Sequence, residues 1–297
     1  MHSARTAEGV GDGPRSISTN ARRPPGADRD EVVVGMTVME TAREIWSYRE
    51  LFYFLAWRDV KVRYKQTALG IAWAILQPFL TMVVFTLLFG KLAGMPSDGM
   101  PYPVFYFCAL LPWMYFSTTL TNTGNSLVAN AHLITKVYFP RFILPSAAAF
   151  SGLVDFAVGC VLLAGIMVYY QIVPDWEVMI WPLLVLLLVV LALAVGMVLA
   201  ALNVRYRDVK YTLPFIVQLW LFVTPVIYPM SIIPDRYRVF VLLNPLSGII
   251  DGFRASLVPG RQIDWTLLGS SAFVTLALFA VGAVYFSRTE RTFADIV

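Results

Sequence analysis

Long apolar segments separated by short polar ones make up most of the chain. Six of them approach the roughly 20 residues that a helix needs to cross the hydrocarbon layer of a bilayer. They are residues 70–90, 104–120, 147–170, 178–202, 211–228 and 265–286. The pattern predicts an all-α integral membrane protein with six transmembrane helices, in a domain that covers residues 67–297.

Prolines interrupt two of the six predicted spans. Pro112 lies in the second span, and Pro214 and Pro225 lie in the fifth. Because proline lacks a backbone N–H, it leaves a carbonyl group that a neighbouring helix or a water-lined cavity must satisfy. We therefore expect these two spans to be broken or to line a path.

The segment before the first span divides into two parts. Residues 1–39 are rich in glycine, proline, arginine, aspartate and serine, which predicts a disordered cytoplasmic leader. Its longest apolar stretch, Val32–Val34, is too short for a secretory signal. In residues 40–66, by contrast, apolar side chains recur at helical spacing at Ile45, Tyr48, Leu51, Phe52 and Leu55.

Residues 40–66 therefore predict an amphipathic helix. It carries Trp46, Tyr53 and Trp57, which suit the headgroup layer, and a basic end that suits an anionic surface. We expect this interfacial helix to lie in the membrane plane. The alternative is a helix that contacts only protein.

The connection between the fifth and sixth spans, residues 229–264, contains two short apolar segments. They are Val239–Leu243 and Leu246–Ile250, and Asn244 and Pro245 between them are typical of a turn. Each is too short to span a membrane. We predict an external re-entrant hairpin, and the alternative is an external cap that lies flat.

Composition and charge place the chain in a membrane. Hydrophobic residues are 58% of the chain and charged residues only 14%, against about 25% charged in ordinary soluble domains. Of the 23 lysines and arginines, 18 fall on the amino-terminal segment, the carboxyl-terminal segment and the loops on their side of the membrane. By the positive-inside rule both termini are cytoplasmic. The net charge of +4 therefore reflects topology and does not indicate nucleic-acid binding.

Motifs for catalysis are absent from the sequence. The Gly90-Lys91 pair has Phe85 where a phosphate-binding loop needs its first glycine, and there is no HExxH or GxSxG motif. We expect no catalytic residue, no metal site and no directly bound cofactor. Asp155 is the one carboxylate deep within a predicted span, where a charge is costly. It is either part of a functional path or hydrogen-bonded between helices.

Three segments carry a family resemblance. They are Arg58–Phe79, Leu110–Pro145 and Thr224–Arg254, the last containing NPLSGIIDGFR. From residue 41 onwards the chain resembles the permeases of type-2 ABC transporters, specifically those that export O-antigen, capsular polysaccharide or teichoic acid. This resemblance implies a multi-pass subunit of the cytoplasmic (inner) membrane that exports a lipid-linked polysaccharide. It further implies a homodimer with two copies of a separate ABC ATPase subunit, which uses the ATP.

Two other functions remain open at this point. One is the permease of an exporter for a drug or a lipo-oligosaccharide. The other is a membrane-embedded glycosyl or phosphoryl transferase, which would act without an ATPase.

Three groups of candidate site residues follow. Aromatic rings stack on sugars, although membrane interfaces also use them, so a glycan path is expected at Trp113, Tyr115, Phe116, Asp155, Trp220 and Tyr228. Cations that meet lipid headgroups or a carrier pyrophosphate, or that only anchor the chain, are Arg58, Lys61, Arg63, Arg205, Arg207 and Lys210. The resemblance places the ATPase contact on residues 40–57 and 125–141, where we select Leu127, Leu133, Ile134, Lys136 and Arg141.

Overall fold

The computed structural model describes residues 47–65, 71–137, 139–206, 208–258 and 261–290, and within these ranges all regular structure is helical. The predicted leader, the first part of the predicted amphipathic helix and Arg207 lie outside the described residues. The all-α prediction is confirmed for the described part of the chain.

Five helical segments are long and apolar enough to cross a membrane. They correspond to the first, second, third, fourth and sixth predicted spans. Their bounds are α3 (Ile71–Phe85) continued by η2 (Thr86–Leu92), α4 (Tyr102–Ala129), α6 (Ile143–Tyr169), η3 (Trp176–Ile180) continued by α7 (Trp181–Arg205), and α11 (Trp265–Glu290).

The fifth predicted span is a shorter helix, α8 (Val209–Val223). Its 15 residues measure about 22 Å at 1.5 Å per residue, less than the roughly 30 Å of a hydrocarbon core. The helix ends because Thr224 is extended and Pro225 follows it. Pro214, in contrast, lies within the helix. Six complete spans therefore remain a prediction, and five are supported by length.

Of the two alternatives for the second span, a break at Pro112 is wrong, and a place along a path remains a prediction. Helix α4 continues through this proline for 28 residues. The tertiary surroundings explain this, because α4 lies at the centre of the helices and packs against α6, α7, α10 and α3. In its most apolar stretch 78% of the residues are buried, against 11% in the first span. Packing on all sides of α4 holds the helix despite the missing N–H.

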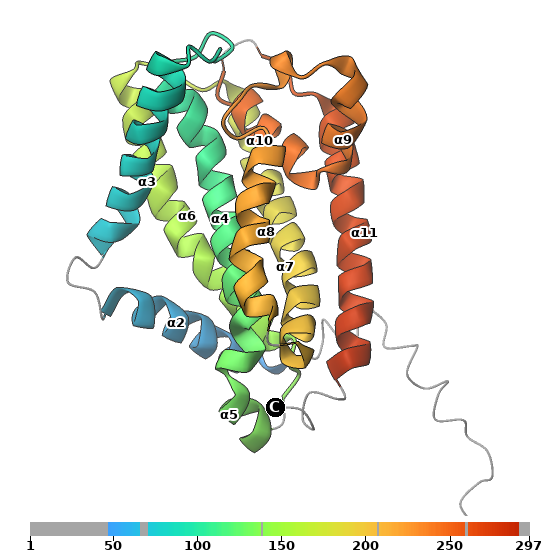
Figure 1. Cartoon of the computed structure of the whole chain (residues 1–297). Coiled ribbons are helices and arrows are strands. Elements are labelled where there is room, and N and C mark those ends of the chain that lie inside the picture. The colour runs from blue at the N-terminus through green and yellow to red at the C-terminus, as the bar shows by residue number, and fades with distance from the viewer. Residues whose placement is uncertain (1–46, 66–70, 138, 207, 259–260, 291–297) are drawn as a thin grey trace, which may run out of the picture. The chain divides into compact units, whose positions relative to one another are not determined.

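Helix α2 (Arg49–Lys65) runs across the direction of α3 and α4, as Figure 1 shows. Leu55 is fully buried in a cluster with Leu127, Ile143 and Phe286, and Tyr48, Leu51 and Phe52 pack at its edge. Four residues of the predicted apolar face therefore pack on protein, and the fifth, Ile45, lies outside the described residues. Tyr53, Phe54 and Trp57 are exposed on the other side. The position of α2 in the membrane plane remains a prediction.

Two short helices follow the turns η4 (Met230–Ile232) and η5 (Asp235–Tyr237) at the end of the protein opposite α5 (Ala131–Lys136) (Figure 1). They are α9 (Arg238–Leu243) and α10 (Pro245–Ala255), separated by Asn244, whose side chain caps α10 by accepting from the Leu246 N–H. Every residue of α10 is buried, and α10 packs mainly on α11, α4 and α7. The two apolar segments thus form helices, and their entry into a membrane stays a prediction.

Close packing of α10 on α11 depends on Gly248. A Cβ at this position would lie 2.5 Å from the Leu267 carbonyl oxygen and 2.4 Å from Ser271 Oγ. We expect Gly248→Ala to lower the thermal midpoint of the purified protein by several degrees, because backbone must move to admit the methyl group. Gly269→Ala on α11 is the matched control, since its Cβ would meet nothing within 4 Å. Equal midpoints for the two variants would contradict this packing.

Candidate functional site

A charged side chain lies near the middle of α6 and is paired with the end of α2. The Arg63 Nη1 donates to Asp155 Oδ2, and the Tyr64 hydroxyl donates to Asp155 Oδ1. The pair is partly accessible, because the side chains of Arg63 and Asp155 are 29% and 31% exposed. Asp155 is therefore hydrogen-bonded between helices, one of the two roles that its sequence position left open.

The pair opens onto a cavity of about 290 Å³ between α2, α3, α4 and α6. Tyr115 also lines this cavity, with its hydroxyl donating to the Ala149 carbonyl at 3.0 Å. Tyr115 and Asp155, which the sequence predicted to line a glycan path, thus lie beside Arg63, which it predicted to contact a lipid headgroup. The remaining walls are mainly apolar, with Trp73, Leu111, Met114 and Phe156 among them.

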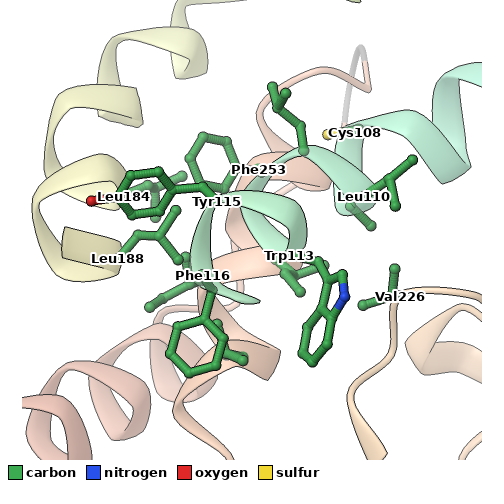
Figure 2. Packing of buried hydrophobic residues seen from close by; sticks show 14 of the residues in the cluster. Cys108, Leu110, Trp113, Tyr115, Phe116, Leu184, Leu188, Val226 and Phe253 are labelled. Atoms are coloured by element: carbon green, nitrogen blue, oxygen red, sulfur yellow. The ribbon is translucent and has the colours of Figure 1, made fainter. Parts of the chain in front are cut away.

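The other predicted path residues lie away from this cavity. Trp113 and Phe116 are buried in the core around α4, and Figure 2 shows them among Leu110, Leu188 and Val226. The ring of Phe116 meets that of Trp220 edge-on, with centroids 5.1 Å apart. In this arrangement the rings fill the core, and their use as a sugar-binding surface remains a prediction.

The chain between α8 and η4 is held by side chains from the α9–α10 hairpin. Trp220 Nε1 donates to Asn244 Oδ1 at 3.2 Å, and Asn244 Nδ2 donates to Thr224 Oγ1 at 2.9 Å. The Tyr228 hydroxyl donates to the Phe222 carbonyl at 3.1 Å, next to the end of α8. Trp220 and Tyr228 therefore stabilise the end of this helix.

Arg254 of α10 is the largest fully buried side chain and was not selected from the sequence. Its guanidinium donates to the carbonyl oxygens of Pro225 and Val226, both at 2.6 Å, and of Tyr228 at 3.2 Å. It also lies over the Phe105 ring, 3.9 Å from the centroid. Burial lowers the pKa of Arg254 to about 10, so the side chain stays charged at neutral pH. It supplies donors to carbonyls that the end of α8 leaves free.

A second arginine, Arg261, links α10 to the loop before α4 at the same end of the protein. Arg261 Nη2 donates to Asp251 Oδ1 at 2.8 Å and its Nη1 to Asp98 Oδ2 at 3.3 Å, and Ser231 Oγ donates to Asp98 Oδ1. Burial raises the pKa of the Asp251 carboxyl group, while Arg261 opposes that shift. The loops on either side of the α9–α10 hairpin are thus tied to the loop before α4.

The remaining predicted cations have different surroundings. Arg58 pairs with its neighbour Asp59 at 2.8 Å, and Lys61 lies over the Trp57 ring. Arg205 lies over the Tyr206 ring, and Lys210 is exposed at the start of α8. Lys61, Arg205 and Lys210 thus present their charge at the surface.

The predicted ATPase contact falls on the end of α4 and on α5. Leu127 and Ile134 are buried in the same cluster as Leu55, and Leu133 packs at its edge. Arg141 is bound to the end of α11, because its backbone N–H donates to Glu290 Oε1 at 2.8 Å and its guanidinium donates to the Glu290 carbonyl. Only Lys136 of the five selected residues points fully outward, next to the exposed Val137.

Over most of its length the chain is similar to known proteins that are named for export or transport. The O-antigen export system permease protein RfbA of Myxococcus xanthus is 32% identical over 263 residues, which cover 88% of this chain and 100% of that protein. A protein of the same name from Klebsiella pneumoniae is 26% identical over 84% of this chain and 95% of its own length. The polysialic acid transport protein KpsM of Escherichia coli is 24% identical over 78% of this chain and 91% of that protein.

The family model of the ABC-2 type transporter matches residues 50–258. This region runs from α2 to just beyond α10 and includes the Arg63–Asp155 pair, the cavity and Arg254. The chain belongs to the ABC-2 type transporter family.

Proposed function

We propose that this chain is the membrane-spanning subunit of an ATP-driven exporter that moves a lipid-linked polysaccharide across the cytoplasmic membrane. The observation that carries the proposal is the similarity to an O-antigen export permease over that protein's full length. Five helices of spanning length and the ABC-2 family match agree with a transport subunit.

In this proposal the chain works as a homodimer, and ATP is hydrolysed by two copies of a separate ABC ATPase. The sequence supports the second part, since it contains no phosphate-binding loop. Phe215, Leu219 and Phe222 are exposed along α8 and must be covered by lipid or by a second copy, so α8 is the surface that we assign to the homodimer contact. The α9–α10 hairpin enters the membrane from the external side.

Deletion of the gene for this chain tests the function. We expect surface polysaccharide to disappear while lipid-linked glycan accumulates inside the cell, and a plasmid copy to restore export. Accumulation is the decisive measurement. Loss of the glycan without accumulation would indicate a transferase, and unchanged glycan with altered drug sensitivity would indicate a drug exporter.

Topology gives a second test. With both termini in the cytoplasm, cysteines at Ala7 and Asp295, which lie outside the described residues, should not react with an impermeant thiol reagent in intact cells. Ala93→Cys should react, because Ala93 is exposed in the loop between the first two spans and apart from the Asp98–Arg261 pair. Labelling at Asp295→Cys in intact cells would contradict the six-span topology.

The function also predicts the effect of changing Asp155. Because ATP drives transport, no ion-coupled carboxylate is needed, and Asp155→Asn should keep most of the export rate. The amide can still accept from Arg63 or Tyr64, and a partly exposed ion pair contributes about 1 kcal/mol or less. The measurement is export per molecule of protein in cells. Complete loss of export at normal abundance would indicate a proton-relay role instead.

A further inference from the structure

Two hollows lie side by side where α2 packs on α6, a region that we name the α2–α6 seam. The first is the cavity of about 290 Å³ described above. The second, of about 280 Å³, is lined by Trp57, Val60, Lys61, Tyr64, Val154 and Val158. Tyr64 lines both, so the two hollows adjoin along α6.

Each hollow contains one cation in an otherwise mainly apolar lining. Arg63 lines the first and Lys61 lines the second. Lys61 and Arg63 are two residues apart, and each residue turns a helix by about 100°, so their side chains leave α2 about 200° apart, on opposite sides of it. They therefore flank Tyr64, with one positive charge on each side of it.

Both cations retain hydrogen-bond donors for a further anion. A guanidinium has five N–H donors, and in the described part of the chain the bond found for Arg63 is the one to Asp155. Lys61 Nζ lies 5.7 Å from the Trp57 ring centroid, and no carboxylate pairs with it among the described residues. Lys65, exposed at the end of α2, adds a third positive charge against the single negative charge of Asp155.

The seam also lies at a polar end of the first span. Tyr64 comes eight residues before Ala72, where that span begins, so the charged end of α2 precedes the span on the side that the positive-inside rule assigns to the cytoplasm. Apolar walls below a cluster of cations match a molecule that has a phosphate at one end and a hydrocarbon chain at the other.

We propose that the α2–α6 seam binds one lipid phosphate, with Arg63 as the ligand of the phosphate, the adjoining hollows as the site for its hydrocarbon part, and Lys61 adding positive charge on the other side of Tyr64. The site lies within a single chain and does not depend on the identity of the exported substrate. Arg63 then holds the lipid on one side and Asp155 on the other, so the lipid joins α2 to α6.

Native mass spectrometry of the purified full-length chain in detergent tests this site. Phosphatidylglycerol, a prenyl phosphate, diacylglycerol and inorganic phosphate are titrated separately. We expect saturable binding of one phosphatidylglycerol or prenyl phosphate per chain, and binding at least about tenfold weaker for diacylglycerol. Tighter binding of the prenyl phosphate would identify a lipid carrier, and tighter binding of phosphatidylglycerol a membrane phospholipid; either supports a lipid-phosphate site.

Variants distinguish the effect of charge on lipid binding from an effect on folding. Arg63→Gln with Lys61→Gln should weaken lipid binding about tenfold or more. Arg58→Gln is the matched control on the same helix, because Arg58 pairs with Asp59 and lines neither hollow. Ala74→Phe should reduce binding by filling the first hollow without changing charge.

A second double variant covers the case in which an unpaired Asp155 destabilises the protein. Arg63→Gln with Asp155→Asn removes both charges of the pair, and its thermal midpoint without lipid should stay near that of the wild type. The proposal fails if this variant binds lipid as tightly as the wild type. It also fails if Arg58→Gln weakens binding equally, if diacylglycerol binds as well as the phosphate lipids, or if inorganic phosphate alone binds.

Discussion

Replacing Arg254 by leucine is expected to destabilise the protein by about 3 to 5 kcal/mol, because the change leaves several buried carbonyl groups without donors. The guanidinium binds three carbonyl oxygens between Pro225 and Tyr228 and lies over Phe105 of α4. One side chain thus joins α10, the chain after α8, and α4. Arg254→Lys should give an intermediate loss, since an ammonium group keeps the charge but lacks the planar fork.

Thermal unfolding of the purified variants measures the effect. Arg238→Leu is the matched control, because Arg238 forms an exposed pair with Asp264 at 3.4 Å and such pairs contribute about 1 kcal/mol or less. We expect Arg254→Leu to lose far more stability than Arg238→Leu. Similar midpoints for the two variants would mean that water or lipid satisfies the carbonyls after α8.

The role of Arg254 could not be predicted from the sequence alone. The apolar segment before Asn244 matches α9, whereas the one after it, Leu246–Ile250, covers only the first half of α10. The need for Arg254 arises only when α8 ends before Pro225 and leaves carbonyls buried against α10, a contact between segments about 29 residues apart. An arginine at the end of an apolar segment, with a proline-interrupted span nearby, was the available signal.

The Arg63–Asp155 pair illustrates a different limit. Hydropathy selected Asp155 as a costly charge, and charge patterning selected Arg63 near the headgroups. Their pairing joins residues 92 positions apart, which no local periodicity can reveal. The same applies to Trp113 and Phe116: their aromatic character was visible, whereas their burial in the core depends on how α4 packs.

The family resemblance likewise did not show what covers the apolar side chains of α5. The sequence indicated Leu133 and Ile134 as a surface for the ATPase. In the structure Ile134 is 8% exposed and packs on the protein's own cluster around Leu55 and Leu127. A charge at Ile134 therefore acts on folding first.

Ile134 is buried and Val137 is exposed, so substitutions at these two positions test folding and coupling separately. Ile134→Asp should reduce the amount of protein in the membrane severalfold, because a carboxylate would be buried without a partner. Val137→Asp should leave abundance unchanged, since Val137 is 50% exposed just after α5. If the ATPase seats on this end of the protein, Val137→Asp should weaken its co-purification and lower export per molecule about fivefold or more, by desolvating a charge in the interface.

Val137→Thr is the control for that variant, because it keeps the shape of valine without adding charge. Immunoblots of membranes measure abundance, and affinity purification of the chain measures the bound ATPase. Normal ATPase binding and export in Val137→Asp would place the contact elsewhere, with the exposed residues of α2 as the next surface to test. Coupling is thus expected to depend on the outward side of α5, while its inward side, through Ile134, holds α5 against the cluster that also anchors α2.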